Sequence, residues 1–367
     1  MNLVLEHKQR LNKTTKLMVD NGVSTLLVTP GANLRYLTGY KAKNLERLTC
    51  LVLQENEIPT IIVPKLEKLA AIDAGIEALD IKIVTWEETE SSLSKINKPK
   101  ATGIIAVDAS MNSAKLLEFQ KFFYENSFID SRFIMDNIRN TKSKYEIDQL
   151  VLAGKYIDTV HKEIPVLFET GDTEKSLARK ISNLITDVGH ETVDFTIVAS
   201  GKNSASPHHE PGETLINKGD VLVIDIGGTI PSGYCSDSTR TYVVGNCPPD
   251  FQRNYEVLKQ AQELAVNAVE KELTAEELDS VARDHLIKSG LGEFFIHRTG
   301  HGIGMETHEE PYIVKGNDKL LMNGNAFSIE PGFYIEDKYG ARIEDIVVKS
   351  GNGTINCNNS TKDLVFI

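Results

Sequence analysis

The sequence has no run of clustered lysine and arginine, and over its 367 residues 52 acidic side chains outnumber 40 basic ones, for a net charge of -12. A protein that binds nucleic acid, or one held on an anionic membrane, needs a concentrated positive surface. The composition therefore excludes nucleic acid and membrane as partners. We expect the partner to be a small molecule or a peptide.

Long apolar runs and paired cysteines are also missing. No apolar run approaches the ~20 residues that cross a bilayer. Residues 1–16 have neither the apolar centre of a signal peptide nor the arginine-rich pattern of a transit peptide. The four cysteines show no C-x-x-C spacing of a zinc or redox motif. We expect a cytoplasmic protein with reduced thiols.

The length predicts two domains, because a domain of roughly 100–200 residues buries its own core. Short β-branched runs alternate with helical or turn segments up to residue 108, which is typical of an α/β domain. The sequence turns polar at residues 140–146, and a long amphipathic helix follows. We place the domains at 1–140 and 141–367. The elements expected in the first domain are strands Ser24–Val28, Cys50–Leu53, Thr60–Val63, Ile81–Thr85 and Ile104–Val107, and helices Pro64–Gly75 and Asn112–Asn126.

The second domain combines punctuated helices with short strands. Glycines close the expected helices Glu174–Val188 and Ala275–Ser289, and Thr274 with Glu277 forms a capping box before the latter. Many glycine and proline turns separate the strands, which predicts antiparallel pairing in a second α/β domain. The strands expected there are Phe195–Ser200, Val221–Ile226, Thr239–Val244, Ala326–Glu330 and Arg342–Val348.

Four acidic residues lie in or beside apolar strand sequence: Asp225, Asp237, Glu330 and Glu344. His301 lies among three glycines that let the backbone approach its imidazole. A charge in a buried strand needs a partner or a cation. Four carboxylates carry too many negative charges for a single hard cation, but together with one imidazole they suit two divalent ions that share carboxylates and hold a hydroxide between them.

Each of these residues also has a structural interpretation. An acid at a strand end is more often a cap, a turn residue or half of an ion pair, and a histidine among glycines is more often a turn residue. Only the joint occurrence of five such positions favours a dinuclear metal site. Their spacing is irregular, so the residues alone leave both interpretations open.

Six segments in order resemble the pita-bread metallopeptidases, specifically the proline peptidase branch that comprises Xaa-Pro dipeptidase (prolidase) and Xaa-Pro aminopeptidase. They are 201–208 (GKNSASPH), 223–227 (VIDIG), 236–241 (SDSTRT), 297–304 (HRTGHGIG), 328–332 (SIEPG) and 342–345 (RIED). The resemblance implies an N-terminal creatinase/prolidase-like α/β domain and a C-terminal pita-bread α+β metallopeptidase domain. Thr307 departs from the isoleucine or valine usual in the family.

The resemblance also implies a set of metal ligands. Asp225 would be a terminal ligand of one ion, Asp237 and Glu344 would bridge, and His301 with Glu330 would bind the other. The cofactors would be two divalent ions, with Mn²⁺ expected first and Co²⁺, Zn²⁺ or Fe²⁺ as alternatives. Glu330 would also accept the proton of the attacking water.

Three further residues have roles implied by the resemblance. His208 would stabilise the oxyanion or shuttle a proton, and His308 would contact the substrate near its proline. Arg342 would either orient this region or meet a substrate carboxylate. His209 is interpreted as a loop residue, and His297 as either a support of the site or a core histidine.

The predicted function is hydrolysis of the peptide bond before proline in Xaa-Pro dipeptides, by a homodimer. Xaa-Pro aminopeptidase, which acts on longer peptides, is the alternative within the family, and methionine aminopeptidases usually lack such an N-terminal domain. A metal-independent creatinase-like hydrolase and a non-catalytic binding relative would both be expected to have lost ligands. The complete ligand set argues against these two.

Overall fold

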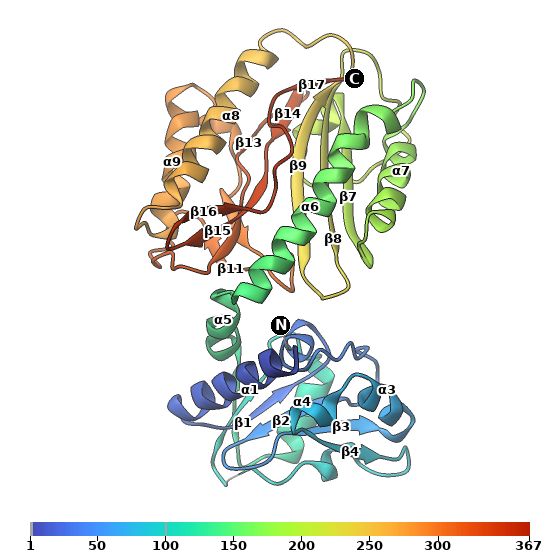
Figure 1. Ribbon diagram of the computed structural model, residues 1–367, viewed down its shortest axis with the longest axis vertical. Coiled ribbons are helices and arrows are strands. Elements are labelled where there is room, and N and C mark those ends of the chain that lie inside the picture. The colour runs from blue at the N-terminus through green and yellow to red at the C-terminus, as the bar shows by residue number, and fades with distance from the viewer. Residues whose placement is uncertain (1–2, 100) are drawn as a thin grey trace. The chain divides into compact units, whose positions relative to one another are not determined.

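The computed structural model describes residues 3–99 and 101–367, which form two compact units that divide between Arg139 and Asn140 (Figure 1). The division falls where the sequence turns polar. Within the described residues, no helix combines the length and the apolar character needed to cross a membrane.

The first unit is a mixed six-stranded sheet in the order β4-β3-β2-β1-β5-β6. Its strands are β1 (Val23–Val28), β2 (Cys50–Gln54), β3 (Thr60–Pro64), β4 (Lys82–Trp86), β5 (Ile104–Val107) and β6 (Ser127–Asp130). Its helices are α1 (Leu3–Asp20), α2 (Ala32–Thr38), α3 (Lys68–Asp73), α4 (Ser113–Phe122) and α5 (Arg132–Asn140), with short 3-10 turns η1 (Lys65–Glu67), η2 (Ile76–Leu79) and η3 (Ser92–Lys95). The five predicted strands are confirmed to within one residue at each end.

The helix predicted over Pro64–Gly75 is wrong in part. Pro64 ends β3, η1 follows it, and only Lys68–Asp73 is α-helical. Leu66 and Leu69, which lie at helical spacing in this segment, are 65% and 72% exposed. Apolar periodicity shows which residues share a helix face, but not whether that face has anything to pack against.

The second unit contains two sheets and a hairpin. One sheet has the order β17-β9-β8-β7, and the other has the order β11-β10-β12-β15-β16. The strands are β7 (Thr192–Ser200), β8 (Val221–Thr229), β9 (Cys235–Val243), β10 (Gly300–Gly302), β11 (Glu309–Ile313), β12 (Ala326–Ile329), β13 (Gly332–Ile335), β14 (Tyr339–Arg342), β15 (Asp345–Ser350), β16 (Gly353–Asn356) and β17 (Val365–Phe366). The predicted antiparallel pairing is confirmed for β7, β8 and β9, and β13 pairs β14 as the hairpin.

Helices cover the two sheets from opposite sides (Figure 1). They are α6 (Lys144–Leu167), α7 (Glu174–Asp187), α8 (Phe251–Ala268) and α9 (Ala275–Lys288), with 3-10 turns η4 (Gly201–Ala205) and η5 (Gly292–Phe294). One core packs α6 and α7 against β8, and the other packs α8 and α9 against β12, β13 and β15. The predicted capping box of Thr274 and Glu277 is confirmed, since each side chain accepts the other's backbone N–H.

Candidate metal centre

A cavity of about 930 Å³ in the second unit is lined by every site residue that the sequence predicted. They come from both sheets, from the β13–β14 hairpin and from loops: His208, Asp225, Asp237, His301, His308, Glu330, Arg342 and Glu344. Residues more than 130 positions apart in the sequence therefore meet in one place. The cavity is within the size range typical of small-ligand sites.

Asp225 and Asp237 lie on neighbouring strands. In the β8–β9 register Asp225 pairs with Thr239, and Asp237 pairs with Gly227. Because residues two apart on a strand share a face, both carboxylates leave the sheet on the same side. Asp237 lies inside β9, because this strand begins at Cys235, four residues before the predicted strand Thr239–Val244.

Glu344 occupies a break between two strands. The single strand predicted over Arg342–Val348 is wrong, because β14 ends at Arg342 and β15 begins at Asp345. The chain changes partner here, and the Glu344 backbone N–H donates to the Thr239 carbonyl at 3.1 Å. This turn brings Glu344 to β9, where its Oε2 accepts from the Thr239 hydroxyl at 2.7 Å. The break therefore places Glu344 beside the two aspartates.

His301 lies on the three-residue strand β10, between β11 and β12. A Cβ on Gly300 or Gly302 would collide with the backbone of the neighbouring strands, so the glycines permit this close packing. The His301 Nδ1 lies 3.1 Å from the Gly302 carbonyl, which makes Nδ1 the protonated nitrogen. The bare Nε2 then faces Glu330 Oε1 at 3.4 Å, Asp237 Oδ2 at 3.6 Å and Glu344 Oε1 at 3.9 Å.

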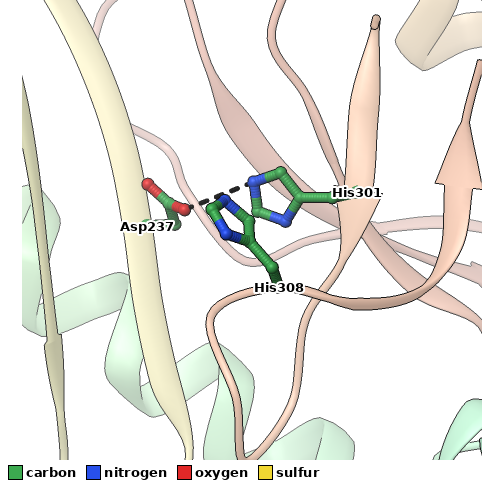
Figure 2. A group of neighbouring side chains, drawn as sticks. All are labelled: Asp237, His301 and His308. Atoms are coloured by element: carbon green, nitrogen blue, oxygen red, sulfur yellow. Dashed lines mark ion pairs between the residues drawn. The ribbon is translucent and has the colours of Figure 1, made fainter. Parts of the chain in front are cut away.

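His308 faces the same point from the loop before β11. Its ring lies 4.1 Å from that of His301 in an edge-to-face arrangement, and both imidazoles turn toward Asp237 (Figure 2). Donor atoms of these three side chains lie within 4.8 Å of one another. The geometry therefore places His308 among the groups that could hold a cation, as well as at the cavity wall.

The electrostatics of the cluster are unfavourable without a cation. Burial, together with the neighbouring carboxylates, raises the pKa of Asp237 and of Glu344 well above their usual range. Burial raises the pKa of Glu330 to about 7 and lowers that of His301 to about 3. Glu344 Oε1 is buried and has no hydrogen-bond partner. The charge of Arg342 offsets these shifts only in part, so the buried acids that face a bare imidazole nitrogen lack enough positive charge to stabilise their ionised forms.

The donor set fits two divalent ions. Three groups of donors lie within 4.8 Å: Asp225, Asp237 and Glu344; His301, Glu330 and Glu344; and Asp237, His301 and His308. Asp237, Glu344 and His301 each belong to two groups, and of these three the two carboxylates have a second oxygen with which to bridge adjacent ions. Carboxylate oxygens with one or two imidazoles suit Mn²⁺ and also Co²⁺, Fe²⁺ or Zn²⁺.

Arg342 makes its contacts with the protein itself. It donates from Nη2 to Asp225 Oδ2 at 2.6 Å, from Nε to the Thr239 hydroxyl at 2.9 Å and from Nη1 to the Tyr334 hydroxyl at 2.8 Å. Such contacts are expected of a residue that orients a metal-ligating side chain, here Asp225. His297, the other residue with two interpretations, also lines the cavity and contacts the Tyr334 hydroxyl through Nε2 at 2.9 Å.

His208 is exposed in the cavity and lies on a loop that is anchored by hydrogen bonds to Glu174. The buried carboxylate of Glu174 accepts from the backbone of Ser200 at 2.8 Å and from the side chain of Asn203 at 3.0 Å. His209 Nε2 meets the other oxygen of Glu174 at 2.8 Å. His209 thus anchors the loop that carries His208.

Sequence reasoning missed several residues of the site. Thr239 could have been found, because it lies two positions after Asp237 on the same strand face. Arg298 also lines the cavity, with its guanidinium 4.5 Å from the centre of the Tyr312 ring; it lies in the segment 297–304, but the sequence analysis gave it no role. The remaining lining residues that were missed are Asp194, Phe195, Ile197, Ser206, Pro207 and Ile296.

Comparisons with known proteins cover nearly the whole chain. The model of metallopeptidase family M24 matches residues 148–350, and that of the creatinase/prolidase N-terminal domain matches residues 10–141. The Xaa-Pro dipeptidase of Lactobacillus helveticus is 36% identical over 97% of this chain and 98% of its own length. The crystal structure of dipeptidase PepE from Mycobacterium ulcerans has a TM-score of 0.92 at 39% identity, covering 99% of this chain and 98% of that one. The prolidase from Thermococcus sibiricus has a TM-score of 0.90 at 36% identity, covering 98% and 99%.

Proposed function

The chain belongs to metallopeptidase family M24, and we propose that it hydrolyses the peptide bond before proline in Xaa-Pro dipeptides, using two divalent metal ions. Its first unit is a member of the creatinase/prolidase N-terminal domain family. One observation carries the proposal: the cluster of carboxylates around the bare His301 Nε2, inside a cavity of about 930 Å³.

The proposed ligands of one ion are Asp225, Asp237 and Glu344, and those of the other are His301 and Glu330 with Asp237 and Glu344 shared. When bound, two such ions lower the pKa of water and polarise a peptide carbonyl, which addresses both reasons that an amide resists hydrolysis. Mn²⁺ is the proposed metal because the donors are mainly carboxylates, and Co²⁺, Fe²⁺ and Zn²⁺ are the alternatives to test.

The proton transfers are proposed for side chains that reach the cavity. Glu330 is 14% exposed there, so its carboxylate can take a proton from water and return it to the prolyl nitrogen as that nitrogen leaves. His208 stands exposed on the cavity wall, where its imidazole can donate a hydrogen bond to the developing oxyanion. His308 faces the same space and is proposed to contact the substrate near its proline.

The terminal carboxylate of an Xaa-Pro dipeptide needs a positively charged side chain in the cavity to bind it. Arg342 was one expectation, but its donors meet Asp225, Thr239 and Tyr334. Its proposed role is therefore to orient Asp225. Arg298 is the other arginine of the lining, and we assign the carboxylate to it. A free carboxylate beside the proline distinguishes a dipeptide from a longer peptide, so this contact favours dipeptides.

The test compares Ala-Pro, Ala-Pro-Ala and Pro-Ala as substrates after metal removal and after addition of Mn²⁺. Turnover of Ala-Pro above Ala-Pro-Ala, with Pro-Ala inert, is the expected order. Higher turnover of Ala-Pro-Ala would favour the Xaa-Pro aminopeptidase alternative. Absence of turnover with Mn²⁺, Co²⁺, Fe²⁺ and Zn²⁺ alike would contradict the peptidase assignment. The expected homodimer and cytoplasmic location stay predictions, which sedimentation and cell fractionation measure.

A further inference from the structure

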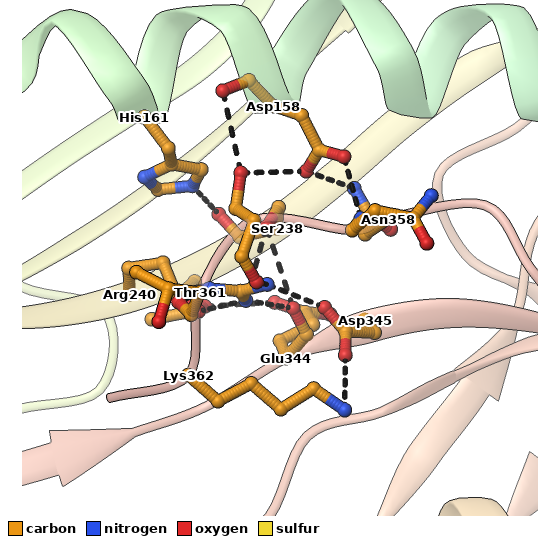
Figure 3. A network of polar contacts seen from close by, with 12 residues as sticks. Asp158, His161, Ser238, Arg240, Glu344, Asp345, Asn358, Thr361 and Lys362 are labelled. Carbon is orange, nitrogen blue, oxygen red and sulfur yellow. Dashed lines mark hydrogen bonds and ion pairs between the residues drawn. The ribbon is translucent and has the colours of Figure 1, made fainter. Parts of the chain in front are cut away.

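A polar network lies behind the metal centre, on the side of β9 that faces α6. Figure 3 shows it running from Asp158 through Asn358 and the C-terminal segment to Arg240, Asp345 and Lys362. Arg240 lies at its centre and is 3% exposed. The roles proposed for the residues of the cavity do not use this network.

All five N–H groups of the Arg240 guanidinium have acceptors. Nη1 donates to the carbonyls of Glu344 at 2.7 Å and Thr239 at 2.9 Å. Nη2 donates to Asp345 Oδ1 at 2.6 Å and to the Ser360 carbonyl at 3.0 Å. Nε donates to the Thr361 carbonyl at 2.9 Å. An ammonium group carries its three donors on one atom, so lysine could not reproduce this arrangement.

These contacts fix the backbone of Glu344 on both sides of its side chain. Its N–H donates to the Thr239 carbonyl at 3.1 Å, and its carbonyl accepts from Arg240 and from the Ser238 hydroxyl at 3.3 Å. Glu344 lies in the break between two strands, where no continuous ladder holds it. Hydrogen bonds with Arg240 and with β9 fix the Glu344 backbone in place of the strand pairing that is missing there.

The C-terminal segment 358–362 is fastened in turn by α6. Asp158 accepts from the Asn359 backbone N–H at 2.5 Å and from the Ser360 hydroxyl at 2.9 Å. One turn further along α6, His161 Nε2 lies 3.2 Å from the Ser238 carbonyl. The helix therefore holds both the segment and the strand that flank Arg240.

We propose that Arg240 is a positioning residue for the metal ligand Glu344, and that the C-terminal segment 358–362 holds Arg240 in that role. The inference rests on the proposed metal site. Partners behind a ligand orient it, and their loss typically weakens metal binding about 10- to 100-fold. The segment thus supports a site whose last ligand lies 14 residues before it.

The test measures metal binding in the full chain after dialysis against a chelator. Free Mn²⁺ is followed by electron paramagnetic resonance, and bound Co²⁺ by its visible absorption. Arg240→Lys is expected to bind Mn²⁺ about 10- to 100-fold more weakly with an altered Co²⁺ spectrum. Asp158→Asn is expected to weaken binding by less, in the same direction.

Arg10→Lys is the matched control. Arg10 is also buried, and it donates to the Tyr36 carbonyl at 2.9 Å and to Glu6 at 3.3 Å in the first unit. The Arg10→Lys variant should have a lower melting temperature and unchanged Mn²⁺ binding. Arg240→Lys with wild-type Mn²⁺ affinity and Co²⁺ spectrum would overturn the inference. If Arg240→Lys does not fold, a wild-type Mn²⁺ affinity and Co²⁺ spectrum in Asp158→Asn would overturn the inference. A wild-type chain that binds no Mn²⁺ would instead refute the proposed function.

Discussion

Arg342 donates to Asp225 across 2.6 Å inside the cavity, and because of this contact we assign the substrate carboxylate to Arg298 instead of Arg342. The guanidinium meets a proposed metal ligand, so its charge already has a partner. Arg298, with its guanidinium near the Tyr312 ring, lines the same cavity and has no such carboxylate contact in the described residues.

The two arginines should therefore differ in kinetics. Arg298→Met removes a charge-assisted hydrogen bond to substrate, a contact of about 1.5–3 kcal/mol, so KM for Ala-Pro should rise about 10- to 100-fold. Arg342→Met leaves Asp225 with the Thr239 hydroxyl but without its charged partner, and should lower kcat and metal affinity. Steady-state kinetics with each variant separates the effects. An unchanged KM in Arg298→Met would contradict the assignment of the carboxylate.

Asp237→Ala should lose metal and activity while the fold persists. Removing one buried carboxylate relieves repulsion among the others, so the metal-free variant should melt at or above the temperature of the metal-free wild type. Metal content by atomic absorption and melting by calorimetry measure both effects. Asp194→Ala, at the exposed edge of the same cavity, is the control and should retain metal. Unchanged activity in Asp237→Ala would refute its role as ligand.

The buried His161 should make stability depend on pH. Burial, followed by the charge of Arg240, lowers its pKa to about 3 in the folded chain, below the usual 6.5. The folded state therefore keeps this imidazole neutral. Its contribution to stability is complete above pH 6.5 and is lost as the pH falls from 6.5 toward 3.

His161→Gln removes the titration and should flatten the dependence of the unfolding free energy on pH. Between pH 6.5 and 5 one titrating group accounts for about 1.6 kcal/mol. Urea unfolding at both pH values in wild type and variant gives the difference. Equal slopes would show that His161 does not titrate as described.

The buried pair of Lys142 and Glu309 should matter for stability. Their side chains are 1% and 10% exposed, and Nζ lies 2.6 Å from Oε1. Lys142→Met leaves a buried carboxylate without this partner, at a cost of about 3–5 kcal/mol. The double variant with Glu309→Leu should recover most of that loss, as denaturant unfolding would show. A single variant as stable as wild type would contradict this.

The sequence predicted which residues meet in the cavity better than it predicted what supports them. Asp225, Asp237 and Glu344 could be recognised because acids are rare in apolar strands and the flanking motifs are distinctive. The break before Asp345 could not be predicted, because it depends on the Glu344 N–H pairing with β9 instead of continuing a ladder. Arg240 is part of a recognised motif, yet its acceptors at 360 and 361 lie far away in the sequence.

The same limit applies to elements on the surface. The strands of the first unit follow from β-branched runs that tertiary packing reinforces. The exposure of Leu66 and Leu69 depends on what the rest of the fold places over them, and local spacing carries no information about that. Local pattern therefore predicts the type of an element more reliably than its environment.

A titration of the metal-free protein with Mn²⁺, followed by the rate of Ala-Pro hydrolysis, tests the central claim most directly. The rate should rise with occupancy, saturate at two ions per chain and return to zero after a chelator is added. Hydrolysis that persists in the chelator, or that saturates with no bound Mn²⁺, would contradict the account of a dinuclear Xaa-Pro dipeptidase.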